Sequence, residues 1–234
     1  MNLKDILRKI NNCENHLDIK NINYINFNPW PMIRLMTVHK VNVNNNCKNV
    51  AMQNSLYKKI LLKIKTLIVS FYKYIKNPIK KEKIDILYFT RKSELQDIIH
   101  QKLFNRYSDT LKYFFDEQYK IKVLEIKDNE IDADVTYIDF LIKIVQVKIK
   151  IKKLFKLNQN FDVRSINDVI KSEFNFTLDI VTLKNNLFLI YELSLMFEKI
   201  PQKLDPKVVF LVCFYRVDAM AMSLACHNLG IKTG

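Results

Sequence analysis

The chain contains very little glycine. Only Gly230 and Gly234 occur in its 234 residues, whereas average usage would give about 16. Phosphate-binding loops need several glycines, because a tight turn and a close approach of the backbone to the phosphate leave no room for a Cβ atom. A nucleotide cradle of the usual Gly-rich kind is therefore excluded within these residues.

Cysteine is also scarce and is not spaced for metal binding. The four cysteines form no CxxC pair, and Cys/His neighbours occur only around Cys13 and at Cys226–His227. These isolated pairs supply too few ligands for a zinc site. We therefore predict no metal site and no other cofactor. The lack of a disulfide framework indicates a reducing compartment.

Arginine is rare in a chain that is otherwise strongly basic. The net charge is +14 and there are 38 basic residues, of which six are Arg: Arg8, Arg34, Arg91, Arg106, Arg164 and Arg216. Proteins that bind nucleic acid usually rely on Arg for bidentate contacts. An anionic membrane surface is therefore a better candidate partner than nucleic acid. Codon bias toward Lys, Ile and Asn remains the simpler explanation of the charge.

No segment of the sequence reads as a convincing membrane span or signal peptide. The first 20 residues lack an apolar core, which predicts a cytoplasmic protein. Residues 60–75 are the best candidate for a span, but they are too short and carry three lysines. Their apolar residues recur at helical spacing on one side, and further lysines flank them over residues 58–83. This helix either packs on the core, the simpler interpretation, or lies peripherally on the inner face of the plasma membrane.

The apolar pattern alternates between strand-like and helix-like segments. Short apolar runs predict buried parallel strands at residues 84–90, 121–126 and 207–214. Helical spacing predicts helices at residues 95–118 and 217–229, and two or three helical pieces at residues 165–199, with Ser165 as N-cap.

Residues 136–157 fit both an alternating strand and a helix. We favour a helix, because the pattern extends over about 15 residues and exceeds the length of a typical strand. The whole pattern predicts an α/β protein that is rich in helix and has a mainly parallel sheet. A helical and extended segment at residues 1–83 is expected to precede an α/β domain at residues 84–234.

Gly230 is expected to end the last helix. It follows the Ala- and Met-rich run 217–229 and precedes Ile231-Lys232-Thr233, which looks like the start of a strand. A glycine in this place suits the left-handed C′ position of a helix end. The segment therefore predicts a strand–helix–strand unit.

The candidate site residues follow two of the predicted strands, because ligands of open α/β sheets bind beyond the carboxyl ends of the strands. An Arg at each end offers a guanidinium fork for a phosphate or a sugar acid. A nearby carboxylate at each end offers a proton acceptor. Ordinary clustering of charged residues in surface loops would give the same pattern. The candidates for substrate binding are Thr90, Arg91, Ser93, Tyr215 and Arg216, and those for catalysis are Glu94 and Asp218.

Several of these segments resemble one enzyme family. The run from Val208 to Thr233 is similar to the last strand–helix–strand of the N-terminal domain in GT-B-type glycosyltransferases of bacterial capsule and O-antigen synthesis. The likeness lies in an apolar strand, an aromatic and polar turn, an Ala-rich helix and a final step: Val208–Phe214, Tyr215-Arg216, Asp218–Asn228 and Leu229-Gly230-Ile231-Lys232-Thr233. Three other segments resemble the acceptor-side half of the same enzymes: Trp30–Arg34, Leu87–Arg91 and Phe104–Asp109.

The resemblance implies a Rossmann-like domain of GT-B type that is incomplete at its C-terminus. The family continues with a Gln-His-Gly segment and a second domain for the nucleotide-sugar, which these 234 residues do not contain. It therefore implies an acceptor-side half, inactive alone, whose partner is a lipid-linked or polysaccharide acceptor, with the nucleotide-sugar bound only through a missing domain. A basic module for nucleic acid and a non-enzymatic fragment remain as alternatives.

Overall fold

The structure is a computed structural model and describes most of the chain. The described residues are 2–19, 21–45, 56–91, 96–99, 102–105, 114, 118–126, 135–154, 163–211 and 215–234. The chain forms two compact units, one of Met1–Met52 with Lys153–Ile190 and one of Gln53–Lys152 with Tyr191–Gly234. These units interleave along the sequence, unlike the consecutive segments 1–83 and 84–234 that the sequence predicts. The division falls inside helix α7 (Ile180–Phe197).

The first unit is helical. It contains α1 (Leu3–His16), α2 (Trp30–Asn45), α6 (Arg164–Phe174) and the beginning of α7. Helix α1 begins where the Asn2 side chain accepts a hydrogen bond from the Asp5 N–H at 2.8 Å, which satisfies one of the free N–H groups of the first turn. Three of its apolar residues are buried at helical spacing: Ile6, Ile10 and Cys13.

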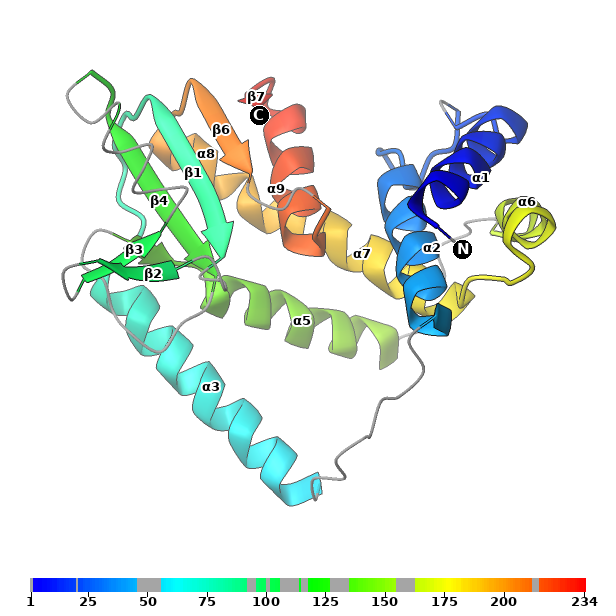
Figure 1. Ribbon diagram of the computed structural model, residues 1–234. Helices are drawn as coiled ribbons and strands as arrows, with labels where there is room; N and C mark the ends of the chain where they lie inside the picture. Colours follow the sequence, from blue (N-terminus) through cyan, green and yellow to red (C-terminus); the bar gives the residue numbers. More distant parts are fainter. Residues whose placement is uncertain are drawn as a thin grey trace. The chain divides into compact units, whose positions relative to one another are not determined.

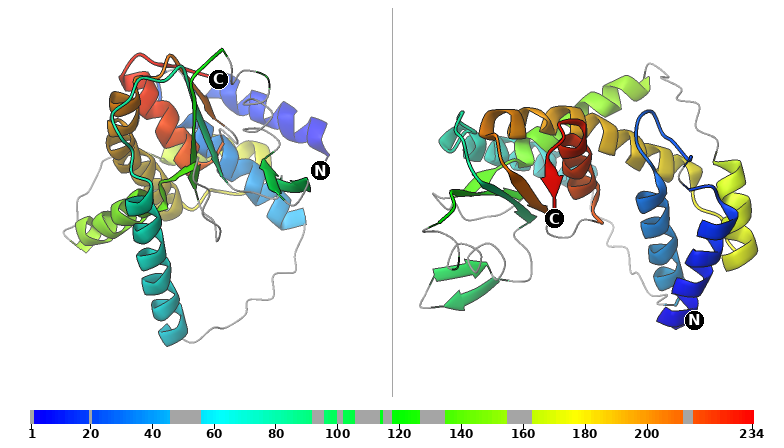
Figure 2. Two further views of the ribbon diagram at one scale, coloured as in Figure 1. Left: turned by 90° about the vertical axis from the view of Figure 1, so that its left-hand side faces the viewer. Right: turned by 90° about the horizontal axis from the view of Figure 1, so that it is seen from above.

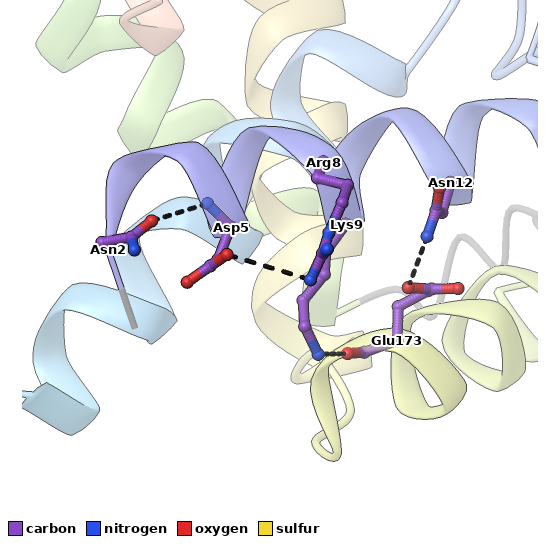
Figure 3. A network of polar contacts seen from close by, with 6 residues as sticks. All are labelled: Asn2, Asp5, Arg8, Lys9, Asn12 and Glu173. Carbon is purple, nitrogen blue, oxygen red and sulfur yellow. Dashed lines mark hydrogen bonds and ion pairs between the residues drawn. The ribbon is translucent and has the colours of Figure 1, made fainter.

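Polar contacts join α1 to α6 (Figure 3). The Asn12 amide donates to the Glu173 carboxylate at 3.2 Å, and the Lys9 ammonium donates to the Glu173 carbonyl oxygen. The predicted N-cap Ser165 was wrong, because α6 begins at Arg164 and Val163 occupies the N-cap position without a side-chain hydrogen bond. Buried packing of Ile166 and Ile170 positions this helix in place of a cap.

The second unit contains a parallel sheet (Figures 1 and 2). Among the described residues this sheet has five strands in the order β5–β4–β1–β6–β7, and every pairing is parallel. The strands are β1 (Ile86–Arg91), β4 (Ile121–Ile126), β5 (Val135–Tyr137), β6 (Val208–Leu211) and β7 (Lys232–Thr233). The three predicted strands are confirmed as β1, β4 and β6, and the structure is an α/β fold as expected.

The predicted helix at residues 95–118 was wrong at residues 96–99 and 102–105, whereas Phe114 in the same range is helical. Residues 96–99 and 102–105 form strands β2 (Gln96–Ile99) and β3 (Lys102–Asn105), which pair antiparallel. Each strand is only four residues long, and pairing of near neighbours in sequence satisfies their backbone groups at little cost in loop entropy. The segment 106–109 of the resemblance lies outside the described residues.

The helices of the second unit are α3 (Leu56–Lys76), α5 (Asp139–Leu154), α8 (Lys199–Leu204) and α9 (Val217–Asn228), together with the end of α7. Helix α5 confirms the choice of a helix for residues 136–157, although Val135–Tyr137 form strand β5. Helices α6, α7 and α8 confirm the prediction of several helical pieces at residues 165–199. Helix α9 packs against β6 and β7.

Gly230 ends α9 as predicted. Its φ of +69° lies in the left-handed region. The Ile231 N–H donates to the Cys226 carbonyl at 2.9 Å, and the Gly230 N–H donates to the His227 carbonyl at 3.0 Å. These two bonds are those of a Schellman motif. The chain then enters β7, and Gly234 continues the ladder, with its N–H donating to the Val209 carbonyl at 3.0 Å.

The amino ends of three neighbouring strands are joined at Asp85. Its carboxylate accepts from the Lys120 N–H at 2.9 Å and pairs with the Lys207 ammonium at 2.7 Å. Its carbonyl accepts from the Lys207 N–H at 3.0 Å. Nearby, Glu82 pairs with both Lys120 and Lys122. This edge of the sheet is therefore occupied by contacts within the protein.

Among the described residues, one helical stretch, Ile180–Leu204, has the length and apolar composition to cross a membrane. Several of its apolar side chains are buried inside the structure, as in the core helix of a soluble protein: Leu183, Leu187, Leu193, Phe197 and Leu204. The stretch is weak evidence for a membrane span, and a soluble protein is not contradicted.

Candidate functional site at the carboxyl ends of two strands

The two strand ends that the sequence singles out belong to neighbouring strands. Strand β1 pairs in parallel with β6, and Phe89 lies opposite Leu211. Because the strands are parallel, the chain leaves both of them at the same edge of the sheet. Strands β4 and β5 lie on one side of β1 in the sheet, and strands β6 and β7 lie on the other side. Such a reversal of strand order marks the usual ligand crevice of open α/β sheets.

The β1 side of this edge is described only in part. Thr90 is buried, and it lies opposite Glu125 of β4 in the parallel register. Arg91 is the last residue of β1 and lies opposite Ile126. The candidates Ser93 and Glu94 lie outside the described residues, so their roles stay predictions.

The β6 side is formed by the start of α9. Arg216 is the N-cap residue with extended backbone, and Asp218 lies in the first turn of the helix. Tyr215, just before them, is exposed. This places the candidate Arg where the free N–H groups and the dipole of the helix also favour an anion.

Arg216 and Asp218 hold each other in a bidentate pair. Arg216 Nε donates to Asp218 Oδ1 at 3.1 Å, and Nη2 donates to Oδ2 at 2.7 Å. Both side chains are largely buried, so screening by solvent is reduced and the guanidinium plane is fixed. The pair engages two of the five N–H donors of the guanidinium.

This pairing bears on the two roles that the sequence predicts. The Arg216 fork is oriented before a ligand arrives, which favours recognition of a phosphate or carboxylate by its remaining donors. Both oxygens of Asp218 already accept hydrogen bonds from Arg216. That arrangement suits a positioning role for Asp218 better than proton transfer, and its catalytic role stays a prediction.

The two cysteines with described side chains are poor nucleophiles. Burial raises the pKa of the Cys13 thiol to about 11 and that of the Cys226 thiol to about 12. Both thiols are therefore protonated at neutral pH, whereas the thiolate is the reactive form. Among the described residues no group of three or more His, Cys, Asp or Glu side chains could hold a metal ion.

One buried charge was not singled out from the sequence. Glu192 of α7 is only 3% exposed, and its Oε2 lies 2.9 Å from the ammonium of Lys148 on α5. A single acidic residue within the apolar run Leu187–Phe197 was the available signal. Carboxylates are seldom buried without a partner. The partner of Glu192 is Lys148, and their ion pair connects α7 to α5.

Comparison of the chain with protein-family models, with curated proteins and with solved structures found no match. The fold is that of a general α/β protein with a parallel sheet, and the candidate site residues lie at the carboxyl ends of β1 and β6.

Proposed function

We propose that the α/β unit binds the phosphate-bearing part of a lipid-linked sugar acceptor at the carboxyl ends of β1 and β6. In this proposal the chain is the acceptor-side part of a glycosyltransferase of bacterial surface polysaccharide synthesis. The observation that carries it is the reversal of strand order between β1 and β6, at the edge where Thr90, Arg91 and Arg216 lie.

The strand order supports a Rossmann-like domain. Numbered within this sheet alone, the order β5–β4–β1–β6–β7 is 3-2-1-4-5, which is the order of the first five strands of the doubly wound dinucleotide-binding fold. One feature departs from that fold, because the hairpin of β2 and β3 lies between β1 and β4 in the chain, where a helix is usual. The strand–helix–strand of β6, α9 and β7 agrees with the segment on which the resemblance to GT-B enzymes rests.

The chemistry of the edge fits an anionic acceptor. A diphosphate linkage carries two negative charges that a fixed guanidinium fork recognises by charge-assisted hydrogen bonds. The α9 N-terminus adds partial positive charge at the same place. Transfer of a sugar would also require a domain that holds the nucleotide-sugar, and that domain would lie outside these 234 residues.

Ligand titration followed by nuclear magnetic resonance tests the proposal. A soluble short-chain polyprenyl diphospho-sugar is added to the isotope-labelled chain, and we expect amide shifts at residues 215–219. Substitution of Arg216 by Gln should weaken binding about tenfold, because hydrogen bonds to charged groups contribute roughly 1.5–3 kcal/mol. Arg216→Lys keeps the charge and loses the fork, so it should also weaken binding.

Lys207→Gln is the matched control, because Lys207 precedes β6 at the opposite edge of the sheet. It removes one positive charge at the amino end of β6, away from the proposed site, and should leave the affinity unchanged. If Lys207→Gln and Arg216→Gln weaken binding equally, the loss of affinity comes from the change in net charge and not from a contact at Arg216. Binding that is absent, or that shifts other amides only, would rule out this site.

A further inference from the structure

Helix α3 turns its apolar stripe toward solvent. Ile64, Ile68 and Ile75 are 50%, 61% and 56% exposed, and Phe71 is also exposed. Their spacing of four, three and four residues places all four side chains along one side of the helix. Helix α3 contacts its unit, as the simpler interpretation expects, but these four apolar side chains stay largely exposed.

The opposite side of α3 makes the contacts within the protein. Ser70 and Lys73 are buried there. The Lys143 ammonium of α5 donates to the Thr66 carbonyl at 2.6 Å and to Ser70 Oγ at 3.2 Å. On this side helix α3 (cyan in Figure 1) contacts the rest of the second unit through polar groups, and the Tyr74 ring also lies near the Phe140 ring, with centroids 5.8 Å apart. Phe71, at the border of the two sides, also meets the Phe140 ring, with centroids 4.8 Å apart.

The charge of α3 restricts what can cover the stripe. Residues 56–76 contain six lysines and no acidic residue: Lys58, Lys59, Lys63, Lys65, Lys73 and Lys76. Lys65 and Lys76 are exposed, and exposed Lys80, Lys81 and Lys83 follow the helix. Two copies of this face would repel each other, so a second copy of the chain is a poor occupant. The complementary surface is both apolar and negatively charged.

We propose that α3 binds the surface of a membrane that contains anionic lipids. The stripe would lie among the acyl chains, and the exposed lysines at 65, 76, 80, 81 and 83 would meet the head groups, as in helices that lie in the membrane interface. Tyr72 suits the boundary, since the Lys76 ammonium lies 5.2 Å from the centroid of its ring. Nucleic acid would pair with the lysines but would leave the apolar stripe in water. This inference is independent of the proposed acceptor site.

Vesicle flotation of the full chain tests the inference. The vesicles contain phosphatidylcholine either alone or mixed with phosphatidylglycerol, and we expect binding to the mixed vesicles only. Ile68→Asp should lower that binding about tenfold or more, because an exposed apolar side chain that enters lipid is replaced by a charge. Val181→Asp is the matched control on α7, where Val181 is 67% exposed; it should bind as the unchanged protein does.

A second pair of variants separates the charge from the stripe. Lys80→Glu with Lys81→Glu should weaken binding steeply, since each lysine near an anionic surface contributes about a fivefold change in affinity. Lys4→Glu with Lys171→Glu changes the net charge equally at exposed lysines elsewhere and should have a much smaller effect.

Other outcomes would overturn the proposal. Equal flotation of the Ile68→Asp and Val181→Asp variants would remove the role of the stripe. A dimer in the absence of lipid that Ile68→Asp dissociates would assign the stripe to a second copy. Sequence-independent DNA binding that survives Ile68→Asp, without flotation, would assign the lysines to nucleic acid. None of these results bears on the titration of Arg216, so the two proposals fail separately.

Discussion

Gly230 has a backbone conformation that favours glycine over other residues. Its φ is +69°, and a Cβ atom built on it would meet no atom within 4 Å. The cost of a side chain here is therefore conformational and not steric. Gly230→Ala should lower the free energy of unfolding by about 1 kcal/mol, and Gly230→Asn should lower it less because Asn tolerates the left-handed region. Urea unfolding measures both, and an Ala variant as stable as the Asn variant would contradict this account.

Single residues also show why the sequence revealed one part of the site and not the other. The Arg residues at 91 and 216 stand out because Arg is rare and each follows an apolar strand. The bidentate contact of Arg216 with Asp218 had no signature, because a spacing of two residues does not normally bring side chains together on a helix. It arises because Arg216 is the N-cap residue, with extended backbone, so its side chain can turn back over the first turn.

At the scale of the element, the ionic contacts at the start of β1 should make stability depend on pH. Hydrogen bonds from Lys122 to Glu82 and from Lys207 to Asp85 are the main causes that lower the pKa of each carboxyl group below its usual value of 4.5 or 3.8. These contacts therefore contribute their full stabilisation of the folded state at a pH above the usual pKa values. The contribution is lost as the pH falls through the lowered pKa values of the folded state. Urea unfolding at pH 7 and pH 3 should show a smaller difference for Glu82→Gln with Asp85→Asn.

The pH dependence should not vanish in that double variant. The pKa of Asp179 in the first unit is also lowered, chiefly by the hydrogen bond from the Thr182 hydroxyl, and it contributes in the same direction. Asp179→Asn alone is thus a control, because it removes a carboxyl group with a lowered pKa that lies in the first unit and not in the sheet. Identical pH dependence in the unchanged chain and the double variant would show that the contacts at β1 do not contribute.

Elements with a long pattern were predictable, and one short pair was not. Helix α5 is 16 residues long and α9 is 12, so their apolar spacing repeats several times and outweighs local ambiguity. Strands β2 and β3 have four residues each. The two residues between them, His100 and Gln101, carry none of the Asn-Gly or Gly signals of a two-residue hairpin. The apolar residues there fit a helix equally well, and only the pairing decides.

At the scale of the whole molecule, the order of the strands could not be derived from the sequence. β1 and β6 are neighbours although more than 100 residues separate them, and no local pattern encodes that pairing. The sequence could therefore identify two strand ends as candidates but could not show that they lie side by side at one edge of the sheet. The division into two units could not be derived for the same reason, because each unit is formed by segments that lie far apart in the sequence.

Because residues 1–52 and 153–190 form one unit, deletion of residues 1–52 should destabilise the helices of residues 153–190. In the first unit α6 packs on α1, and the Asn167 amide donates to the Leu178 carbonyl at 3.2 Å and accepts from the Leu178 N–H at 2.9 Å. Deletion of residues 1–52 removes α1 and α2, so the buried face of α6 loses much of its packing. Hydrogen exchange should then become fast in α6, because a helix of 11 residues is marginal without packing.

The sheet provides the internal control for this deletion. The amides of β1, β4 and β6 belong to the second compact unit, whose strands pair with one another, and they should keep most of their protection. Deletion that abolishes protection in α6 and in the sheet alike would show that the chain folds as one cooperative body. Protection that persists in α6 would mean that residues 153–190 keep their structure without α1. The expected pattern, with α6 exposed and the sheet protected, would place the ligand edge and α3 on a unit whose stability does not require the N-terminal helices.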